Sequence, residues 1–369
     1  MTPVVAVINE LKASDADLAV WFICDRGFET QTRQLLARAD AEVRVEVISA
    51  GKLRRYHGVP LWRQLLDVPT VLANIRDVFK LTAGFFQSLR LLRRIKPDVV
   101  FTKGGFVCVP VGYAARVLGI PLVIHDSDAH PGLTNRLLAK HAAAIATGAP
   151  LSNYAYPRAI TRYVGIPVDE SFKPSTAAEQ AAMKKLLGYD PQRPLVVVTG
   201  GGLGAIRVNE AMLACAKELS AIAQVVHLAG SKNADDVQAR APKTKYYEVL
   251  PFVDEKMSQL IRAADVVVTR AGATTLLELA AAEKPIIIIP NPHLTSGHQL
   301  KNAAVYADAD AAVIVDESKL KSEPQLLMTA ISHLLAHPQR RAQLSQAIGR
   351  LARPDAAKDV AAMVRRAIK

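Results

Sequence analysis

Cysteine is scarce in this sequence of 369 residues. Its three cysteines, Cys24, Cys108 and Cys215, stand far apart in apolar surroundings, so none has the spacing of a zinc site. A disulfide-stabilised secreted domain is disfavoured as well, because such domains are dense in cysteine. The sequence therefore indicates a reducing compartment, which we expect to be the cytoplasm.

Long apolar runs are also missing. A membrane-spanning helix needs roughly 20 predominantly apolar residues, and no segment approaches that length. Residues 3–14 have apolar side chains at helical spacing and are expected to form an amphipathic helix rather than a signal peptide. Half of all residues are nevertheless hydrophobic, which indicates a folded chain, and the length favours two domains.

Positive charge is in excess, formally +12, and much of it lies in residues 49–98. There Lys52, Arg54, Arg55, Arg63, Arg90, Arg93 and Arg94 alternate with Leu61, Trp62, Leu65, Phe79, Phe85 and Phe86. No zinc-finger spacing or RNA-recognition signature accompanies them, so no nucleic-acid partner is expected. Two interpretations remain: a surface for an anionic membrane, and a long core helix with a solvated basic face.

Short apolar runs rich in β-formers alternate with helical segments twice along the chain. Strands are expected at 17–24, 43–50, 98–103, 121–126 and 143–148, and again at 194–200, 224–230, 246–250, 265–270, 285–290 and 311–316. This pattern predicts an α/β fold of two Rossmann-like doubly wound domains with parallel sheets. Pro167 and Pro174 interrupt regular structure near the joint.

The expected domains are residues 1–163 and 164–355, followed by a C-terminal helix, 356–369, that packs back on the first domain. Ligands are expected at the carboxyl ends of the strands, in the cleft between the domains.

One such strand end carries Gly200, Gly201, Gly202 and Gly204 before a helix. Glycines let the backbone approach a phosphate, and the helix N-terminus presents free N–H groups. The spacing also matches the dinucleotide fingerprint, which needs an acid at the end of the next strand. That strand ends in Gly230-Ser231-Lys232, so a nicotinamide enzyme is the weaker interpretation.

A second strand end places Arg270, Thr274, Thr275 and the single acid Glu278 at a helix start. In one interpretation a threonine and Glu278 form a capping box. In the other, Glu278 accepts hydrogen bonds from both hydroxyls of a ribose, and residues 273–275 hold phosphate oxygens. A third loop, 291–304, adds His298 and Gln299 to the same edge. Together these loops predict a nucleotide-sugar site.

Several motifs, in one order, resemble the MurG-type glycosyltransferases. "TGGGLGA", "RAGATTLLELAAAEKPIIIIP" and "GHQLKNA" resemble the donor site of that family, and "GKLRRY", "KPDVVFTKGGFVCVPVGYAA" and "GIPLVIHDSDAHPGLTNRLLAK" resemble its acceptor domain. The resemblance implies the GT-B architecture and transfer of N-acetylglucosamine from UDP-GlcNAc to undecaprenyl-pyrophosphoryl-MurNAc-pentapeptide. It further implies a single inverting displacement with no metal and no cofactor.

The resemblance also implies roles for single donor-side residues. Glu278 matches the ribose-binding acid, Gln299 an amide that contacts the sugar, and Val253 a position whose backbone recognises uracil. The remaining donor-side residues are Gly201, Gly202, Gly204, Arg270, Ala273, Thr274, Thr275 and His298. Gly202 stands where many relatives carry serine. Asp169 stands where many carry a donor-binding arginine, and Arg207 and Arg270 are the candidates to replace it.

On the acceptor side, Lys103, Gly104 and Gly105 form a turn suited to the acceptor pyrophosphate. His125, Asp128 and Asn135 line the next loop. Asp128 is the candidate catalytic residue, which would steer or deprotonate the acceptor hydroxyl, unless it caps the helix that begins near Leu133.

The resemblance implies a peripheral protein on the cytoplasmic face of the cell membrane, docked on the anionic inner leaflet. A related enzyme acting on diacylglycerol and a UDP-sugar-binding protein without catalysis remain alternatives.

The family also has a strand and a glycine turn, GGxxGH, before the residues that "TP" resembles, and the histidine of that turn is its favoured general base. Here Pro3, Val4, Val7, Ile8 and Leu11 already suit the first helix. We therefore expect a start site placed too far downstream, and a 369-residue chain that is poorly stable and nearly inactive. An in-frame stop directly before codon 1, or full activity of this chain, would contradict that expectation.

Overall fold

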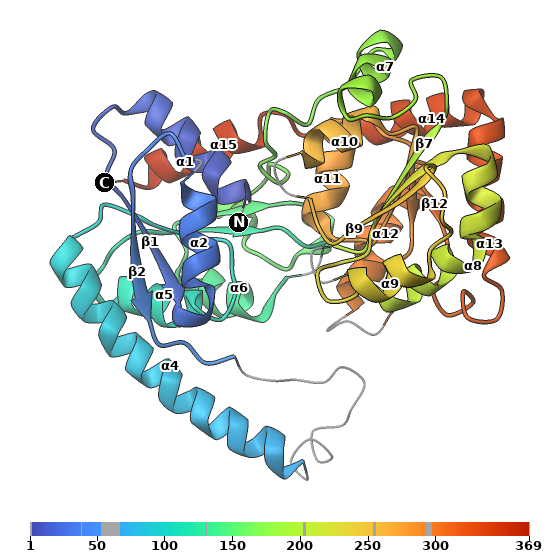
Figure 1. Cartoon of the computed structure of the whole chain (residues 1–369). Coiled ribbons are helices and arrows are strands. Elements are labelled where there is room, and N and C mark those ends of the chain that lie inside the picture. Colours follow the sequence, from blue (N-terminus) through green and yellow to red (C-terminus); the bar gives the residue numbers. More distant parts are fainter. Residues whose placement is uncertain are drawn as a thin grey trace. The chain divides into compact units, whose positions relative to one another are not determined.

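The computed structural model describes residues 2–37, 39–52, 67–129, 131–201, 204–253, 256–292 and 297–368. The chain divides into two compact units. The first comprises Met1–Asp169 together with Arg353–Lys369, and the second is Glu170–Ala352 (Figure 1). The last helix of the chain therefore belongs to the first unit.

Every strand expected from the sequence is present, and every ladder is parallel. This confirms the predicted α/β fold class. In the first unit the strands are β1 (Val20–Asp25), β2 (Val43–Ile48), β3 (Val100–Thr102), β4 (Leu122–Asp126), β5 (Ala144–Thr147) and β6 (Thr161–Tyr163). In the second they are β7 (Leu195–Thr199), β8 (Gln224–Leu228), β9 (Tyr247–Leu250), β10 (Val266–Thr269), β11 (Ile286–Ile288) and β12 (Val313–Ile314). Strand β6 was not expected, because three residues are too few to show a periodic pattern.

The second unit holds one sheet, in the order β12-β11-β10-β7-β8-β9. Its central strands are buried on both faces, because helices cover each side. Figure 1 shows α8 (Ile206–Ile222) and α13 (Gln325–Ala336) on one side of the strands, and α10 (Met257–Ala263) and α11 (Ala273–Ala281) on the other. After β9 the chain returns to the far side of β7, so the topological switch point lies between β7 and β10.

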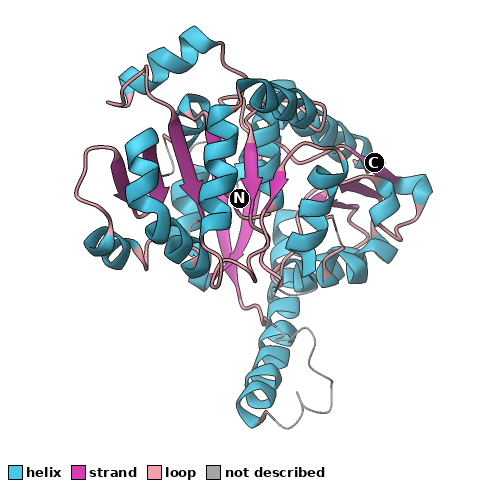
Figure 2. Ribbon diagram, turned by 90° about the vertical axis from the view of Figure 1, so that its right-hand side faces the viewer, coloured by secondary structure: helices cyan, strands magenta, loops and turns pink. Residues whose placement is uncertain are grey.

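The remaining helices of the second unit connect or flank this sheet (Figure 2). They are α7 (Ala177–Leu186), α9 (Ala234–Arg240), α12 (His298–Asp308) and α14 (Pro338–Gly349). Helix α7 begins with a complete capping box between Thr176 and Glu179. Behind it the buried Lys184 ammonium contacts the Asp265 carboxylate at 2.7 Å, which fixes α7 to the start of β10.

In the first unit the strands form two sheets, in the orders β1-β2 and β3-β4-β5-β6. Among the described residues, no ladder joins β1 to β3. The expected N-terminal helix is present as α1 (Thr2–Ser14) and contacts both groups of strands. Its Val5 and Ile8 share a core cluster with residues of β1 and β2, whereas Val7 packs with β4, β5 and the final helix α15 (Ala356–Ala367). Figure 1 shows α1 beside α15.

The described part of this unit also contains α2 (Glu29–Leu36), α5 (Cys108–Val117) and α6 (Leu133–Leu138). The longest helix is α4 (Val68–Ile95). The Asp67 side chain caps its start, and it ends at Lys96 in a left-handed conformation before Pro97.

One face of α4 packs on α5, and the other exposes Leu72, Ile75, Val78, Phe79 and Phe86. Phe85 instead is half-buried and packs against the buried cluster between α4 and α5, which agrees with the core-helix interpretation for this side chain. Trp62, Leu61, Leu65, Arg54, Arg55 and Arg63 lie outside the described residues. Within the described ranges, no helix combines the length and apolar character needed to span a bilayer.

Candidate functional site

Three of the predicted loops lie at one edge of the second unit's sheet. They follow β7, β10 and β11, which are neighbours in the sheet, and all three strands are parallel. Parallel neighbours end at the same edge, so the loops after Thr199, Thr269 and Ile288 come together as the sequence predicted. The first two lie on either side of the switch point, where ligands of open α/β sheets bind.

The loop after β7 depends on glycine. Gly201 has φ +83° and Gly204 has φ +76°, values that favour glycine. A Cβ on Gly204 would lie 2.1 Å from the Ala229 carbonyl oxygen, so a side chain cannot be accommodated there. Gly202 and its neighbour Leu203 lie outside the described residues. The loop ends at Ala205, the N-cap residue of α8.

Helix α11 follows β10. Its N-cap residue is Gly272, so no side chain caps the helix start. Ala273, Thr274 and Thr275 are therefore its first three residues, whose N–H groups have no partner within an α-helix. Glu278 lies in the second turn and is half-buried. A capping box needs its acid at the third helical position. The capping interpretation of this stretch was therefore wrong.

Arg270 does not extend into solvent. Its guanidinium is buried, donates to the Ile289 carbonyl at 3.1 Å and forms an ion pair with the buried Glu317 carboxylate. The other oxygen of that carboxylate lies 3.6 Å from the guanidinium of Arg207, the second residue of α8. Sequence reasoning missed Glu317, because the expected strand 311–316 stopped one residue before it.

Helix α12 contributes to the same edge. The Gln299 side-chain oxygen accepts a hydrogen bond from the Asn291 N–H at 2.9 Å, which ties the helix start to the loop after β11. One turn later, the Asn302 amide donates to the Ala271 carbonyl at 3.0 Å, next to the start of α11. His298 is half-buried as the first residue of α12. Helix α12 thus holds both the loop after β11 and the loop after β10 in place.

A buried polar network supports the glycine loop from behind. The Asn209 amide donates to the Ala229 carbonyl at 3.0 Å and its oxygen lies 3.0 Å from His227 Nε2, while His227 Nδ1 lies 3.0 Å from the Tyr247 hydroxyl. Burial lowers the pKa of His227 to about 4, so the imidazole stays neutral at physiological pH. The network joins residues of α8, β8 and β9. These residues are too far apart in the sequence for their contacts to be predicted from it.

Two other donor-side candidates lie on loops. Val253 is half-buried three residues after β9 ends at Leu250, and Asp169 is exposed at the end of the first unit.

In the first unit, a glycine turn follows β3. Gly104 and Gly105 have φ of +84° and +94°, and the Gly104 carbonyl accepts a hydrogen bond from the Cys108 thiol at 2.9 Å. A Cβ on Gly104 would lie 2.9 Å from the side-chain oxygen of Asn135. That oxygen is buried and has no hydrogen-bond partner among the described residues. Lys103, half-buried, precedes the turn.

The end of β4 is more buried than the sequence suggested. His125 is 0% exposed, and its Nε2 lies 2.8 Å from the Gly165 carbonyl. Burial lowers the pKa of His125 to about 3, and the positive charge of Lys103 adds to that effect. The structure thus places His125 in the core rather than on the acceptor loop.

Asp126 is the next residue and is also buried. Its carboxylate accepts hydrogen bonds from the Tyr156 hydroxyl at 2.6 Å and from the Gly132 N–H at 3.3 Å. Burial raises the pKa of Asp126 to about 6, although hydrogen bonds from Tyr156 and Asn135 lower it. Sequence reasoning missed this carboxylate.

Asp128 is half-buried, and its carbonyl accepts a hydrogen bond from the Tyr154 hydroxyl at 2.5 Å. It does not cap the following helix, because the N-cap residue of α6 is Gly132 and no side chain caps it.

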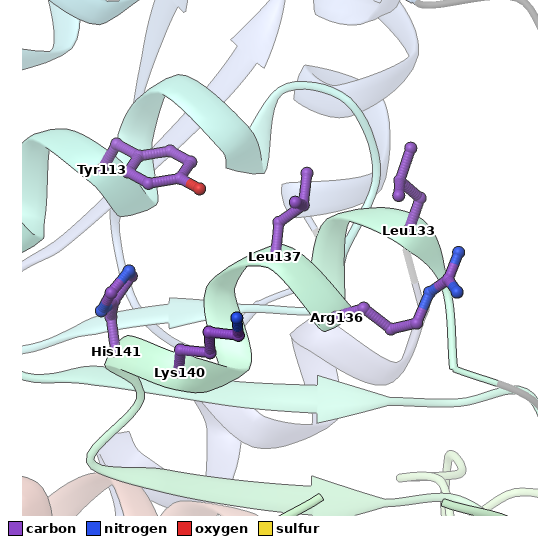
Figure 3. A pocket seen from close by; sticks show the side chains of 6 residues that line it. All are labelled: Tyr113, Leu133, Arg136, Leu137, Lys140 and His141. Atoms are coloured by element: carbon purple, nitrogen blue, oxygen red, sulfur yellow. The ribbon is translucent and has the colours of Figure 1, made fainter. Parts of the chain in front are cut away.

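A cavity of about 570 Å³ lies beside α6. Figure 3 shows Leu133, Arg136 and Leu137 on α6, with Lys140 and His141 just after it and Tyr113 opposite, on α5. Apolar side chains and cationic groups therefore share one pocket.

The arrangement suits an anionic ligand. Two helix N-termini lie at the switch point and favour phosphate oxygens, and the half-exposed Arg207 guanidinium stands at the start of α8. Among the residues that the structure describes, no three His, Cys, Asp or Glu side chains form a group that could hold a metal ion.

Family models and named relatives both match this chain to one glycosyltransferase family. Models of the glycosyltransferase family 28 N-terminal and C-terminal domains match residues 1–147 and 195–360. A Shouchella clausii protein named UDP-N-acetylglucosamine–N-acetylmuramyl-(pentapeptide) pyrophosphoryl-undecaprenol N-acetylglucosamine transferase is 34% identical over 88% of this chain and 84% of its own length. A Halalkalibacterium halodurans protein of the same name is 32% identical over 100% of this chain and 96% of its own.

Two solved structures are also similar. Acinetobacter baumannii MurG has a TM-score of 0.71 at 25% identity, covering 99% of this chain and 95% of its own. A Neisseria meningitidis UDP-GlcNAc 2-epimerase bound to UDP-GlcNAc has a TM-score of 0.67 at 13% identity, covering 99% and 96%, and shows likeness of fold alone.

Proposed function

The chain belongs to glycosyltransferase family 28, and we propose that it transfers N-acetylglucosamine from UDP-GlcNAc to undecaprenyl-pyrophosphoryl-MurNAc-pentapeptide. This reaction converts lipid I to lipid II, the disaccharide lipid precursor of peptidoglycan. The observation that carries the proposal is the match of both family domains, in order, to relatives that bear the name of this transferase.

The donor is proposed to bind at the switch point of the second unit. The first turns of α8 and α11 face the diphosphate with their free N–H groups. Glu278, in the second turn of α11, accepts hydrogen bonds from the ribose hydroxyls. The backbone at Val253 recognises uracil, and Gln299 and His298 lie against the sugar. Charge that develops on the departing UDP falls on helix N-termini and backbone N–H groups, so no metal is needed.

The acceptor is proposed to bind the first unit, with its pyrophosphate at the glycine turn of Gly104 and Gly105. The muramyl hydroxyl attacks the anomeric carbon, the bond to UDP breaks, and the configuration inverts in a single step. The hydroxyl proton must leave during this step, and Asp128 is the proposed group to steer or accept it.

The first unit is also proposed to meet the anionic cytoplasmic leaflet, where a polyprenyl acceptor lies. Helix α4 supports this with its exposed side chains: Phe79 is 72% exposed, Phe86 63% and Leu72 62%. The cavity beside α6 combines Leu133 and Leu137 with Arg136 and Lys140. Apolar groups flanked by cations are typical of surfaces that bind anionic membranes.

The proposal is tested by supplying radiolabelled UDP-GlcNAc with either lipid I or diacylglycerol. The protein should be expressed from its own locus. Label is expected in lipid I. Label in diacylglycerol would favour the related branch that "GIPVDESF" resembles. Label in neither lipid, with UDP-GlcNAc still bound, would identify a binding protein.

A further inference from the structure

The positive charges at the switch point of the second unit exceed the negative charge that contacts them. Arg207 and Arg270 both contact a single carboxylate, Glu317. Each arginine also stands at the start of a helix, Arg207 within the first turn of α8 and Arg270 two residues before the N-cap Gly272 of α11. Helix N-termini carry a partial positive charge and disfavour cations.

No acidic residue lies in the first turn of α8 or α11. Glu317 is buried on the turn after β12, where its side chain is 1% exposed. One carboxylate, Glu317, is therefore shared by two guanidinium groups, and their combined positive charge exceeds what this carboxylate neutralises. Such an arrangement is stabilised when an anion binds.

The two arginines are not equivalent. The Arg270 side chain is 10% exposed and holds both Glu317 and the Ile289 carbonyl, so its guanidinium is fixed behind the loop. The Arg207 side chain is 52% exposed, and its contact with Glu317 is 3.6 Å long. That separation exceeds the range of a charge-assisted hydrogen bond, about 2.7–2.9 Å. The Glu317 oxygen on this side has no hydrogen bond among the described residues.

We propose that Arg207 binds the diphosphate of the donor, and that the buried Arg270–Glu317 pair positions it. This rests on the proposed function, because the donor defines the anion. In the free protein Glu317 holds Arg207 loosely at the edge of the sheet. When the donor binds, the Arg207 guanidinium donates to phosphate oxygens that lie at the helix starts. Arg270 remains with Glu317 and does not contact the ligand.

The test is calorimetric titration of UDP, UMP and uridine into the protein, expressed from its own locus, and its variants. Arg207→Gln is expected to weaken UDP binding about tenfold, the loss of one charged hydrogen bond, while uridine affinity stays unchanged. The salt dependence of UDP binding should also become shallower. Arg340→Gln is the matched control: it removes a half-buried guanidinium that is paired with Asp310 at 2.6 Å, and it should leave all three affinities unchanged.

Glu317→Gln separates positioning from simple structural support. Arg270 would then be buried without its counter-charge, so the melting temperature should fall. Arg207 would lose the carboxylate that positions it, so the ratio of UDP to uridine affinity should fall toward that of Arg207→Gln. A ratio equal to that of the wild type would overturn the positioning role.

UDP affinity of Arg207→Gln within twofold of the wild type would overturn the inference while leaving the proposed function intact. A wild-type chain that binds neither UDP nor uridine would overturn both.

Discussion

Replacing the buried carboxyl of Asp126 by an amide should change how the stability of the first unit depends on pH. Burial raises the pKa of Asp126 from 3.8 to about 6 in the folded protein. Between these two pH values the folded state keeps a proton that the unfolded state has released. The contribution of this carboxyl to stability is therefore full below pH 3.8 and is lost as the pH rises through about 6.

The size of the effect follows from the pKa difference. At about 1.4 kcal/mol for each pKa unit, keeping the charged Asp126 buried costs roughly 3 kcal/mol above the folded pKa. Asp126→Asn cannot titrate. Its free energy of unfolding, relative to the wild type, should rise by roughly 3 kcal/mol between about pH 4 and pH 7. Any constant effect of the substitution on the Tyr156 and Gly132 hydrogen bonds cancels in this pH comparison.

Urea unfolding followed by tryptophan fluorescence is the assay. The chain's two tryptophans, Trp21 and Trp62, both belong to the first 169 residues, so the signal reports on the first unit. Tyr156→Phe is the matched comparison. This substitution removes a hydrogen bond that lowers the pKa of Asp126. The loss of stability with rising pH should therefore occur at a higher pH in Tyr156→Phe than in the wild type. A stability difference between Asp126→Asn and wild type that stays constant over this range would refute the reasoning.

Three further predictions concern the donor and the membrane. Glu278→Ala should weaken UDP-GlcNAc binding by roughly 2 kcal/mol through lost charged hydrogen bonds and leave the melting temperature unchanged; equal affinity by calorimetry would remove Glu278 from the ribose site. Turnover should survive EDTA, because helix N-termini replace a metal at the diphosphate; activity lost on chelation and restored by magnesium alone would contradict this. Phe79→Ser with Phe86→Ser should reduce sedimentation with anionic vesicles without lowering the melting temperature. Phe85→Ser, its half-buried counterpart, should lower that temperature instead, and unchanged vesicle binding by the double variant would exclude α4 as the docking surface.

The fold was predictable because its signals are local. Buried parallel strands appear as short apolar runs, and each expected run contains a strand. The three donor-side loops could be assigned to one edge because parallel strands end together. These inferences need only the identity and spacing of residues near one another in the sequence.

The orientation and partners of polar side chains were harder to predict. His125, near the end of the expected strand 121–126, was expected to line the acceptor loop. All five residues of β4 are buried, so no alternation of polar and apolar residues indicated which way its side chain points. Glu317 and Arg270 are 47 residues apart and meet only because β12 and β10 lie in one sheet. Glu278 resembled a capping acid until the helix start was placed at Gly272. Each of these outcomes depends on tertiary contacts.

The most direct test of the proposed transferase is to deplete the protein in the cell that encodes it and to measure the ratio of lipid I to lipid II. If the chain transfers N-acetylglucosamine to the lipid-linked muramyl pentapeptide, lipid I should accumulate while lipid II falls, and re-expression should reverse both changes. The Glu278→Ala variant should restore the ratio less well than the wild type. A ratio that stays unchanged on depletion would contradict the proposal.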